Sequence, residues 1–382
     1  MAGEDVADYN ALVRAIRQAV AQTREVAKDL RLLFVTNLRE EGDLQDLDSQ
    51  GILNSAQWYT AREAEAMVRS FQDLGLTVEP FFSEIDFIKE VAIPRDANDH
   101  RQRIVYSTAE GGSGAGRRAL LPSLCNLLDL PILNSGAHAS SMVRHKFHAY
   151  TVLRESGIRV PETWQFGRDG WVGGSAPPKG SRVIVKPVYE SMGIGIDNNS
   201  VVTVAPGFED FVAERVRRFQ QPAVVQDFIS GEEVGVPVAR IGKTYALPPI
   251  AQRRASGSGY GGRPKTFHDE HVAHDLSHVV HMSNLAEIEA IRAAAVSAFD
   301  ALDMKGAGRI DFRVDVDGRG WVFDTNGEPP PLAKTCWAVA METLGFSLSE
   351  MLALWVGICL LDYGLTHEST QKESSQQGIS RP

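Results

Sequence analysis

The sequence predicts an α/β protein that begins with a parallel sheet and continues with a small and then a larger α+β unit. Between residues 30 and 135, β-type runs alternate with helix-period segments, which is the pattern of parallel βαβ units. After residue 136, strand-type runs follow one another across turns, which is typical of antiparallel pairs. We expect an N-terminal helix (1–29), an N-terminal α/β domain (30–135), a central subdomain (136–222), a C-terminal domain (223–366) and a disordered tail (367–382).

Hydrophobic periodicity places the individual elements. Leu12, Ile16 and Val20 recur at helical spacing, so residues 8–28 should form a helix that either makes a dimer contact or caps the sheet. Further helices are expected at 60–74, 120–128, 140–156, 208–220, 285–302 and 348–360. Strands are expected at 30–35, 76–82, 103–107, 182–188, 200–204, 224–228, 234–241 and 245–250, with a glycine-rich loop at 110–116 and a polar loop at 255–284.

The composition is that of an ordinary soluble protein. Of 382 residues, 43% are hydrophobic, and the net charge of -10 argues against nucleic acid or an anionic membrane as a partner. Cys125, Cys336 and Cys359 form no CxxC pair, as expected for reduced thiols. Residues 1–29 lack a signal-peptide pattern and the apolar run at 352–361 is short for a membrane span, so we expect a cytoplasmic protein.

Residues 308–326 form the most informative segment. Asp324 and Asn326 share one face of a strand, and a hairpin would bring Asp311 beside them. These hard oxygen ligands suit Mg²⁺, which prefers carboxylates together with substrate phosphates. Arg309 would aim a positive charge at the same place. The alternative is a surface hairpin with solvated acids.

Two further segments suggest a nucleotide site. Lys186 precedes Gly193 and Gly195, whose turn can present backbone N–H groups to an anion, although a plain hairpin turn is the alternative. Residues 226–229 could present a backbone edge to adenine, and Glu233 could accept from ribose, or this could be only an acidic turn. The GxGxxG match at 257–262 is followed by Arg263-Pro264 and no helix, which argues against a dinucleotide fold.

Taken in this order, the three segments resemble the ATP-grasp superfamily, and most closely its D-alanine–D-alanine ligase branch. The resemblance runs from about residue 106 to 360 and includes the stretches 109–112, 127–131, 134–136 and 146–161. It implies that Asp311, Asp324 and Asn326 hold two Mg²⁺ ions (or Mn²⁺) and that Arg309 and Lys265 are catalytic. It also implies contacts to ATP from Lys146, Lys186, Glu190, Met192, Gly193, Gln226, Asp227, Phe228, Ile229, Glu233 and Phe323.

The resemblance implies an ATP-dependent carboxylate–amine ligase. A carboxylate would attack the γ-phosphate to give an acyl phosphate and ADP, and an amine would then displace phosphate to form an amide. Lys265 would reach the γ-phosphate from a lid, and residues 256–262 would supply its flexible part. Such a lid keeps water from the acyl phosphate.

The chain departs from that family at the substrate end. It has Met192-Gly193 where the family has two serines, Ala109–Arg118 where it has His-Gly and Glu-Asp-Gly signatures, and Glu328-Pro329 where it has Pro-Gly. We therefore expect amino acid or short peptide substrates other than two D-alanines. Weaker candidates to bind them are Glu110, Arg117, Arg118, Arg253, Tyr260 and Thr335.

Three hypotheses remain open from the sequence: such a ligase, a true D-alanine–D-alanine ligase, and a non-catalytic ATP-binding protein. A zinc site among the histidines of residues 268–281 is disfavoured, because that loop is polar and lacks cysteines. Cys336 is expected to pack rather than react, and an apolar neighbourhood would raise its pKa.

Overall fold

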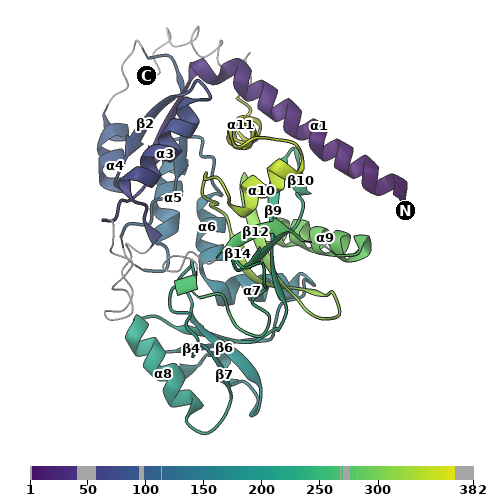
Figure 1. Cartoon of the computed structure of the whole chain (residues 1–382). Coiled ribbons are helices and arrows are strands. Elements are labelled where there is room, and N and C mark those ends of the chain that lie inside the picture. Colours follow the sequence, from purple (N-terminus) through teal and green to yellow (C-terminus); the bar gives the residue numbers. More distant parts are fainter. Residues whose placement is uncertain are drawn as a thin grey trace.

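The computed structural model describes residues 2–40, 57–93, 99–112, 114–266, 268–269, 276–281 and 283–365, with side chains from residue 8 onward. Three sheets organise this part of the chain, with strand orders β2-β1-β3, β5-β4-β8-β6-β7 and β12-β11-β9-β13-β14, and β10 is added to β9. Figure 1 shows the first sheet with its helices at the upper left and the second sheet with α8 at the bottom. The predicted tail at 367–382 lies outside the described residues.

The N-terminal sheet is parallel, as predicted from its alternating elements. Its elements are β1 (Leu30–Val35), α3 (Ala61–Gln72), β2 (Thr77–Phe81), α4 (Glu84–Ala92), β3 (Gln102–Ser107) and α5 (Leu120–Leu127). Helix α4 was not predicted, although Ser83 caps it by accepting a hydrogen bond from the Asp86 N–H. Only Phe87 of this helix is buried, and its Ile85 and Ile88 are exposed.

Helix α1 (Ala2–Val26) packs on α11 (Leu348–Asp362), the last helix of the third unit (Figure 1). Leu12 and Ile16 are buried in the core that these helices share, and the Thr23 hydroxyl donates to the Ala353 carbonyl at 2.7 Å. At the crossing, a Cβ on Gly357 would lie 2.5 Å from the Ala19 carbonyl oxygen. Helix α1 thus has a partner within its own chain, and a dimer contact stays a prediction.

The second sheet is antiparallel throughout. Its strands are β4 (Thr163–Gly167), β5 (Gly170–Trp171), β6 (Arg182–Pro187), β7 (Val201–Thr203) and β8 (Ala223–Asp227), and α8 (Phe208–Phe219) covers it. Strands β4 and β5 were not predicted. Since β8 lies between β4 and β6 in this sheet, we propose that the boundary expected at 222/223 falls after β8 instead.

The helix predicted at 140–156 is in fact two helices, α6 (Ala137–Arg144) and α7 (Lys146–Glu155). The chain breaks at His145, whose φ of -88° and ψ of 86° are not helical. The His145 imidazole accepts a hydrogen bond from the His148 N–H and so caps α7. The break separates Arg144 from Lys146, and both side chains line the cleft described below.

The third sheet carries the predicted hairpin. Its strands are β9 (Glu232–Ile241), β10 (Lys243–Ala246), β11 (Ile250–Arg253), β12 (Ser277–Val280), β13 (Ala307–Val314) and β14 (Gly320–Asn326). The strand predicted at 245–250 is wrong, because Pro248 and Pro249, which have no N–H to donate, separate β10 from β11. Strand β12 lies inside the predicted polar loop. The associated helices are α9 (Leu285–Ala301), α10 (Cys336–Thr343), which was not predicted, and α11.

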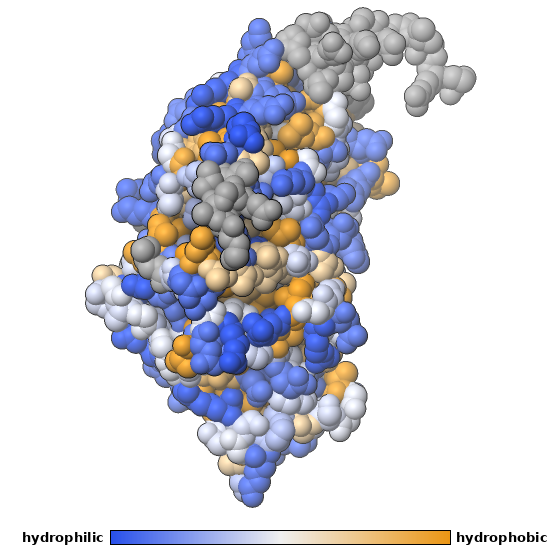
Figure 2. Space-filling model, turned by 90° about the vertical axis from the view of Figure 1, so that its right-hand side faces the viewer, coloured by the Kyte–Doolittle hydropathy of each residue, from blue (hydrophilic) through white to orange (hydrophobic). Residues whose placement is uncertain are grey.

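In the part of the chain that the structure describes, no single helix is long and apolar enough to cross a membrane. Helices α10 and α11 together meet that test of length and composition, but they are bent by 102°. Residues 351–360 of α11 are all buried inside the protein, so the apolarity of this helix is accounted for by the core. The face of the molecule in Figure 2 is mostly hydrophilic, with apolar residues in small groups.

Candidate active site

The β13–β14 hairpin places the predicted metal ligands opposite one another. Asp311 pairs in register with Asp324, and Arg309 pairs with Asn326. Directly after Asp311 the register shifts by a bulge, a feature that re-aims side chains. Because alternate residues of a strand share a face, all four side chains line one cleft, as the sequence predicted.

Most of the other predicted residues line the same cleft. They are Lys146, Lys186, Glu190, Met192, Gly193, Gln226, Asp227, Phe228, Ile229, Glu233, Lys265, Phe323 and Glu110. Four weaker candidates, Arg117, Arg253, Tyr260 and Thr335, are not among the lining residues. The sequence also missed several residues of the lining, which are Gln57, Tyr59, Arg144, Gln252, Arg313 and Glu328.

Asp311 and Asp324 are each bound by a different cation. Arg309 donates to both carboxylate oxygens of Asp311, at 2.7 and 2.8 Å, and Lys146 Nζ lies 3.0 Å from Asp324 Oδ1. Burial raises the pKa of Asp311, and the like charge of Asp324 adds to this, against the lowering effect of Arg309. Burial acts in the same direction on Asp324, but Lys146 and Lys186 bring the pKa of its carboxyl below the usual value.

The donor set of the hairpin fits a divalent cation. Two facing carboxylates and the Asn326 amide oxygen are hard ligands, and a cation between Asp311 and Asp324 would relieve the repulsion that raises the Asp311 pKa. Asn326 Oδ1 accepts one hydrogen bond, from the Glu328 N–H at 2.8 Å, and an amide oxygen has a second lone pair. Asp311, Asp324 and Asn326 would therefore hold Mg²⁺.

Lys186 connects three elements beneath the cleft. Its buried Nζ donates to the Tyr150 hydroxyl at 2.9 Å, to Gln226 Oε1 at 3.1 Å and to the Phe323 carbonyl at 3.2 Å. Burial, reinforced by the charge of Lys146, lowers the pKa of Lys186 to about 7. An anion in the cleft would favour its protonated form.

The loop after Lys186 forms consecutive turns at the edge of the cleft. The Ile194 N–H donates to the Ser191 carbonyl and the Ile196 N–H to the Gly193 carbonyl, at 3.1 and 2.9 Å. Gly195 has φ of 74°, and a Cβ there would lie 2.5 Å from Pro187 Cγ, so this position requires glycine.

Glu233 has the geometry expected for an acceptor to a sugar hydroxyl. Its side chain is buried, and Oε1 accepts from Arg313 at 2.6 Å. The other carboxylate oxygen, Oε2, is also buried and has no hydrogen-bond partner among the residues that the structure describes, while Glu233 lines the cleft. Because an unpaired buried carboxylate oxygen is costly, a donor in the cleft would satisfy it. Gln226 to Ile229, at the end of β8, line the same part of the cleft.

The sequence model of the D-ala D-ala ligase C-terminus matches residues 153–356, which is more than half of the 382-residue chain. The chain belongs to this family. The resemblance stated from the sequence is thus confirmed, and with it the class of enzyme, an ADP-forming carbon–nitrogen ligase that depends on ATP.

Individual relatives agree with this assignment. A D-alanine–D-alanine ligase of Bordetella petrii is 28% identical over 241 residues, which is 62% of this chain and 70% of that protein. One from Pseudomonas putida (strain GB-1) is 25% identical over 243 residues, which is 62% of this chain and 71% of that protein.

Solved structures of this family share the fold at low identity. The D-alanine–D-alanine ligase of Bacillus anthracis complexed with ATP has a TM-score of 0.64 and 16% identity, covering 87% of this chain and 98% of that one. The VanG D-Ala:D-Ser ligase of Enterococcus faecalis has a TM-score of 0.59 and 17% identity, covering 86% and 99%. These likenesses confirm the predicted α/β ATP-grasp fold.

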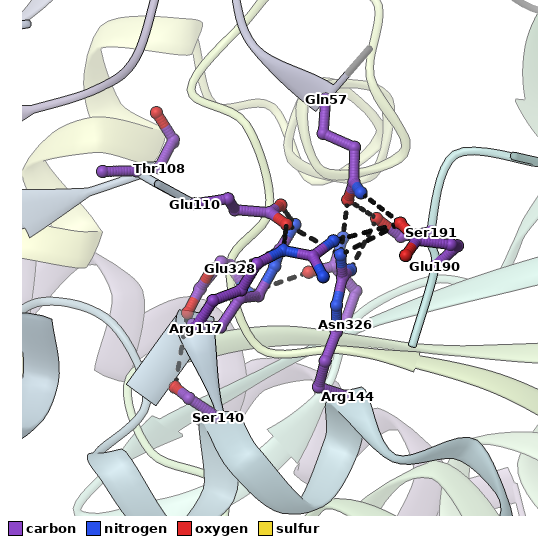
Figure 3. A network of polar contacts seen from close by, with 12 residues as sticks. Gln57, Thr108, Glu110, Arg117, Ser140, Arg144, Glu190, Ser191, Asn326 and Glu328 are labelled. Carbon is purple, nitrogen blue, oxygen red and sulfur yellow. Dashed lines mark hydrogen bonds and ion pairs between the residues drawn. The ribbon is translucent and has the colours of Figure 1, made fainter. Parts of the chain in front are cut away.

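A cluster of three arginines and three glutamates borders the same cleft, and Figure 3 shows its polar contacts. We call it the Arg–Glu cluster, and its members are Glu110, Arg117, Arg118, Arg144, Glu190 and Glu328. Arg144 lies at its centre and donates to Glu110 at 2.8 Å, to Gln57 Oε1 at 2.9 Å and to Ser191 Oγ at 3.0 Å. Burial, with the charges of Arg118 and Arg117, lowers the pKa of Arg144 well below the usual value.

Glu190, which was expected to contact ATP, and Arg117, a weak candidate for the substrate, bind each other in the Arg–Glu cluster. Glu190, expected near ATP, accepts from Arg117 at 3.0 Å and from Gln57 and Gln221 at 2.7 and 2.8 Å. Burial alone would raise the pKa of Glu190, but Arg144 and Arg117 lower it. Arg117 lies behind the lining and holds Glu190, whereas its neighbour Arg118 lines the cleft and binds Glu110 and Glu328.

The remaining weak candidates have structural partners. Arg253 binds Glu232, which also contacts His281 Nδ1 at 2.7 Å. Thr335 caps α10, and Tyr260 is buried beneath two arginines.

Two further predictions concern the histidines of residues 268–281 and the thiol of Cys336. His271 and His274 lie outside the described residues, and among those described no group of three or more His, Cys, Asp or Glu is placed to hold a metal ion. Burial raises the pKa of Cys336 to about 12, and its thiol donates to the Gly235 carbonyl, so it packs as predicted.

Proposed function

We propose that the protein uses ATP to join the carboxylate of one amino-acid-type substrate to the amine of another, through an acyl phosphate. One observation supports this most directly. Two facing aspartates, several cationic side chains and a buried glutamate oxygen with no hydrogen-bond partner among the described residues meet in one cleft. That combination is what a polyphosphate with its counter-ion and ribose requires. The cations that we assign to the phosphates are Arg309, Lys146, Lys186 and Lys265.

At the nucleotide end, Gln226 to Ile229 would border the adenine, and the free Oε2 of Glu233 would accept from a ribose hydroxyl. Lys186 and Lys146 would neutralise phosphate charge from below. Lys146 is held by Asp324, so a nucleotide with Mg²⁺ would compete for both partners of that pair.

In the transfer step, positioning and charge neutralisation do most of the work. Mg²⁺, when bound at Asp311, Asp324 and Asn326, would neutralise charge on the transferred phosphoryl group, and we propose two ions. Arg309 lines the cleft beside this site and would stabilise charge first on the phosphoryl group and later on the tetrahedral carbon. Lys265, at the end of the lid segment, also lines the cleft, and its Nζ donates to Gln252 Oε1 at 2.8 Å. We propose that this lysine reaches the γ-phosphate.

The substrates lie at the end of the cleft that borders the Arg–Glu cluster. Arg118 and Glu328 line this end as an ion pair at 2.6 Å, and Pro330 follows them in the lining. Such a wall offers an arginine to a carboxylate and a glutamate to an ammonium group. We propose small amino acids or a short peptide as substrates, handled in the cytoplasm.

A true D-alanine–D-alanine ligase is the second candidate, because the relatives quoted above carry that name. The departures at Met192-Gly193 and Glu328-Pro329 count against it. A non-catalytic nucleotide-binding role is less well supported, since Arg309, both aspartates and the lysines all lie in one cleft.

The test is to incubate the purified protein with ATP, Mg²⁺ and pooled L- and D-amino acids, while nucleotides and product masses are followed together. ADP, phosphate and a mass equal to two substrates less water would support the ligase and name its substrates. A product from D-alanine alone would favour the second candidate. Formation of AMP would refute the acyl-phosphate route, and ATP binding without turnover on any amino acid would favour the non-catalytic role.

A further inference from the structure

Arg313 on β13 occupies a position that the proposed reaction does not by itself explain. Its side chain is only 5% exposed and lines the nucleotide end of the cleft, two residues beyond Asp311. One terminal nitrogen, Nη2, donates to Glu233 Oε1 at 2.6 Å and to the Arg263 carbonyl at 3.1 Å. The other, Nη1, donates to the carbonyls of Gly231 and Gly261 at 3.1 and 3.2 Å.

These four acceptors belong to different parts of the site. Glu233 and Gly231 lie at the start of β9, beside the proposed ribose position. Gly261 and Arg263 lie in the segment between β11 and Lys265, which is where the lid was predicted. A single guanidinium therefore joins the nucleotide-binding acid to the lid.

Further contacts around this guanidinium join the start of β9 and the end of β8 to the lid segment. The Gly231 N–H donates to the Gly261 carbonyl at 3.2 Å, so the two loops also pair directly. Two guanidinium groups lie over the ring of Phe228, with Arg182 at 4.8 Å and Arg313 at 5.1 Å from its centre. Arg182 in turn donates to the Gly262 carbonyl at 2.5 Å.

We propose that Arg313 is a positioning residue that couples nucleotide binding to closure of the lid over residues 254–265. This rests on the proposed function, since Glu233 must receive the ribose. Arg313 leaves the second oxygen of Glu233 free for the nucleotide while it binds the first, and its other hydrogen bonds require the lid to lie against β9. A nucleotide that orders Glu233 would thus also favour the closed lid.

Arginine suits this role better than lysine. The guanidinium stays charged and presents its donors in a fixed plane, so it can reach a carboxylate and carbonyls on three sides. Lysine would keep the charge beside Glu233 but could not meet all four acceptors in that geometry. Methionine would keep the apolar stem and lose every hydrogen bond.

The experiment measures how far a nucleotide protects the lid from trypsin, with the non-hydrolysable analogue AMP-PNP and Mg²⁺ as the probe. Arg254 and Lys265 are trypsin sites in the lid, while Arg263 precedes proline and resists cleavage. We compare wild type, Arg313→Met and Arg313→Lys, each at saturating AMP-PNP, after binding has been measured separately. Arg240→Met is the matched control. Arg240 lies near the far end of β9, where it pairs with Asp300 of α9, and it does not line the cleft.

We expect saturating nucleotide to slow lid cleavage at least about tenfold in wild type and in Arg240→Met. In Arg313→Met we expect about tenfold weaker binding, the effect of one charge-assisted hydrogen bond, and little protection even at saturation. Arg313→Lys should fall between the two, and it provides the comparison if the methionine variant does not fold. A merely structural Arg313 would weaken binding without changing protection at saturation.

The coupling is wrong if AMP-PNP at saturation protects the lid of Arg313→Met from trypsin as well as it protects the wild-type lid. Arg313→Lys takes the place of Arg313→Met if only the lysine variant folds. This result would leave the proposed function standing. Failure of wild type to bind AMP-PNP would overturn both. Binding to wild type without any protection of the lid would overturn the coupling alone.

Discussion

Asp311 and Asp324 face each other across the β13–β14 hairpin, yet each is neutralised by a different cation, Arg309 for the first and Lys146 for the second. This arrangement places the buried carboxylate of Asp311 beside the partly exposed carboxylate of Asp324, each with its own cation. It also means that a divalent cation entering between them would release Arg309 and Lys146 toward the substrates. Under the proposed function, the hairpin would thus supply both the metal ligands and two cationic side chains for the reaction.

Substitution of one ligand should change the metal dependence. In Asp324→Asn we expect either loss of ADP formation or an Mg²⁺ requirement raised by more than about tenfold, because a charged hard ligand is lost. A titration of initial rate against Mg²⁺ measures this. Asp317→Asn, in the exposed turn of the same hairpin, is the control and should titrate like wild type. Ordinary activity of Asp324→Asn at ordinary Mg²⁺ would contradict the metal assignment.

Arg309 should matter for turnover more than for nucleotide binding. In Arg309→Met we expect kcat to fall by about 10²- to 10³-fold, the usual effect of losing one donor to the transition-state charge. The Kd for ATP, measured by calorimetry, should change little, since Arg309 lies beside the metal ligands rather than beside Glu233. Near-normal kcat would remove Arg309 from the mechanism.

Nucleotide affinity should fall as the pH rises through about 7. The pKa of Lys186 is lowered to about 7, so its phosphate-binding protonated form is lost in the free protein above that pH. If only that form binds, the Kd for ATP should rise about tenfold from pH 6 to pH 8, since each unit above the pKa reduces the charged fraction tenfold. Titrations at saturating Mg²⁺ measure this.

Lys186→Arg serves as the control for that pH dependence, because arginine does not titrate in this range. Its affinity should be nearly constant between pH 6 and pH 8. An equal slope in wild type and Lys186→Arg would show that a different group titrates.

The Arg–Glu cluster should be essential for stability. Arg144→Met leaves the buried carboxylates of Glu110 and Glu190 short of a partner, so we expect the free energy of unfolding to fall by about 3–5 kcal/mol. Denaturant titration measures the loss, and Arg154→Met, an exposed arginine on the next helix, should cost less than about 1 kcal/mol. In the double variant with Glu110→Gln, part of the stability should return. Equal losses in the single and double variants would argue against the charge as the cause.

The contact between α1 and α11 depends on a glycine. In Gly357→Ala the added Cβ would lie 2.5 Å from the Ala19 carbonyl oxygen, so the helices must separate. We expect a loss of about 1–3 kcal/mol in the free energy of unfolding, the usual effect of overpacking. Hydrogen exchange should speed up selectively in α1. Unchanged exchange there would show that the helices adjust without cost. Gly364 has φ of 65°, and a Cβ there would lie within 4 Å of nothing in the part of the chain that the structure describes, so Gly364→Ala tests the effect of backbone strain.

The sequence by itself determined the features that depend on local pattern. The alternation of β and helix periods predicted the parallel first sheet, and the two-residue repeat of Arg309, Asp311, Asp324 and Asn326 predicted a shared face. These succeed because neighbours in sequence fix which way a side chain points on a strand. The resemblance to the ligase family came from the order of such local motifs.

Only the tertiary structure decided which charges meet. Arg144 lies in contact with Gln57, Glu110 and Ser191, which come from three separate loops, and Arg313 holds Glu233, which lies 80 residues away. No local pattern marks such pairs, because an arginine on a surface and one in a buried cluster have the same sequence signature. The break at His145 was missed because histidine is not a common capping residue. The division of β10 from β11 is different, because Pro248 and Pro249 mark it locally and the prediction of a single strand overlooked them.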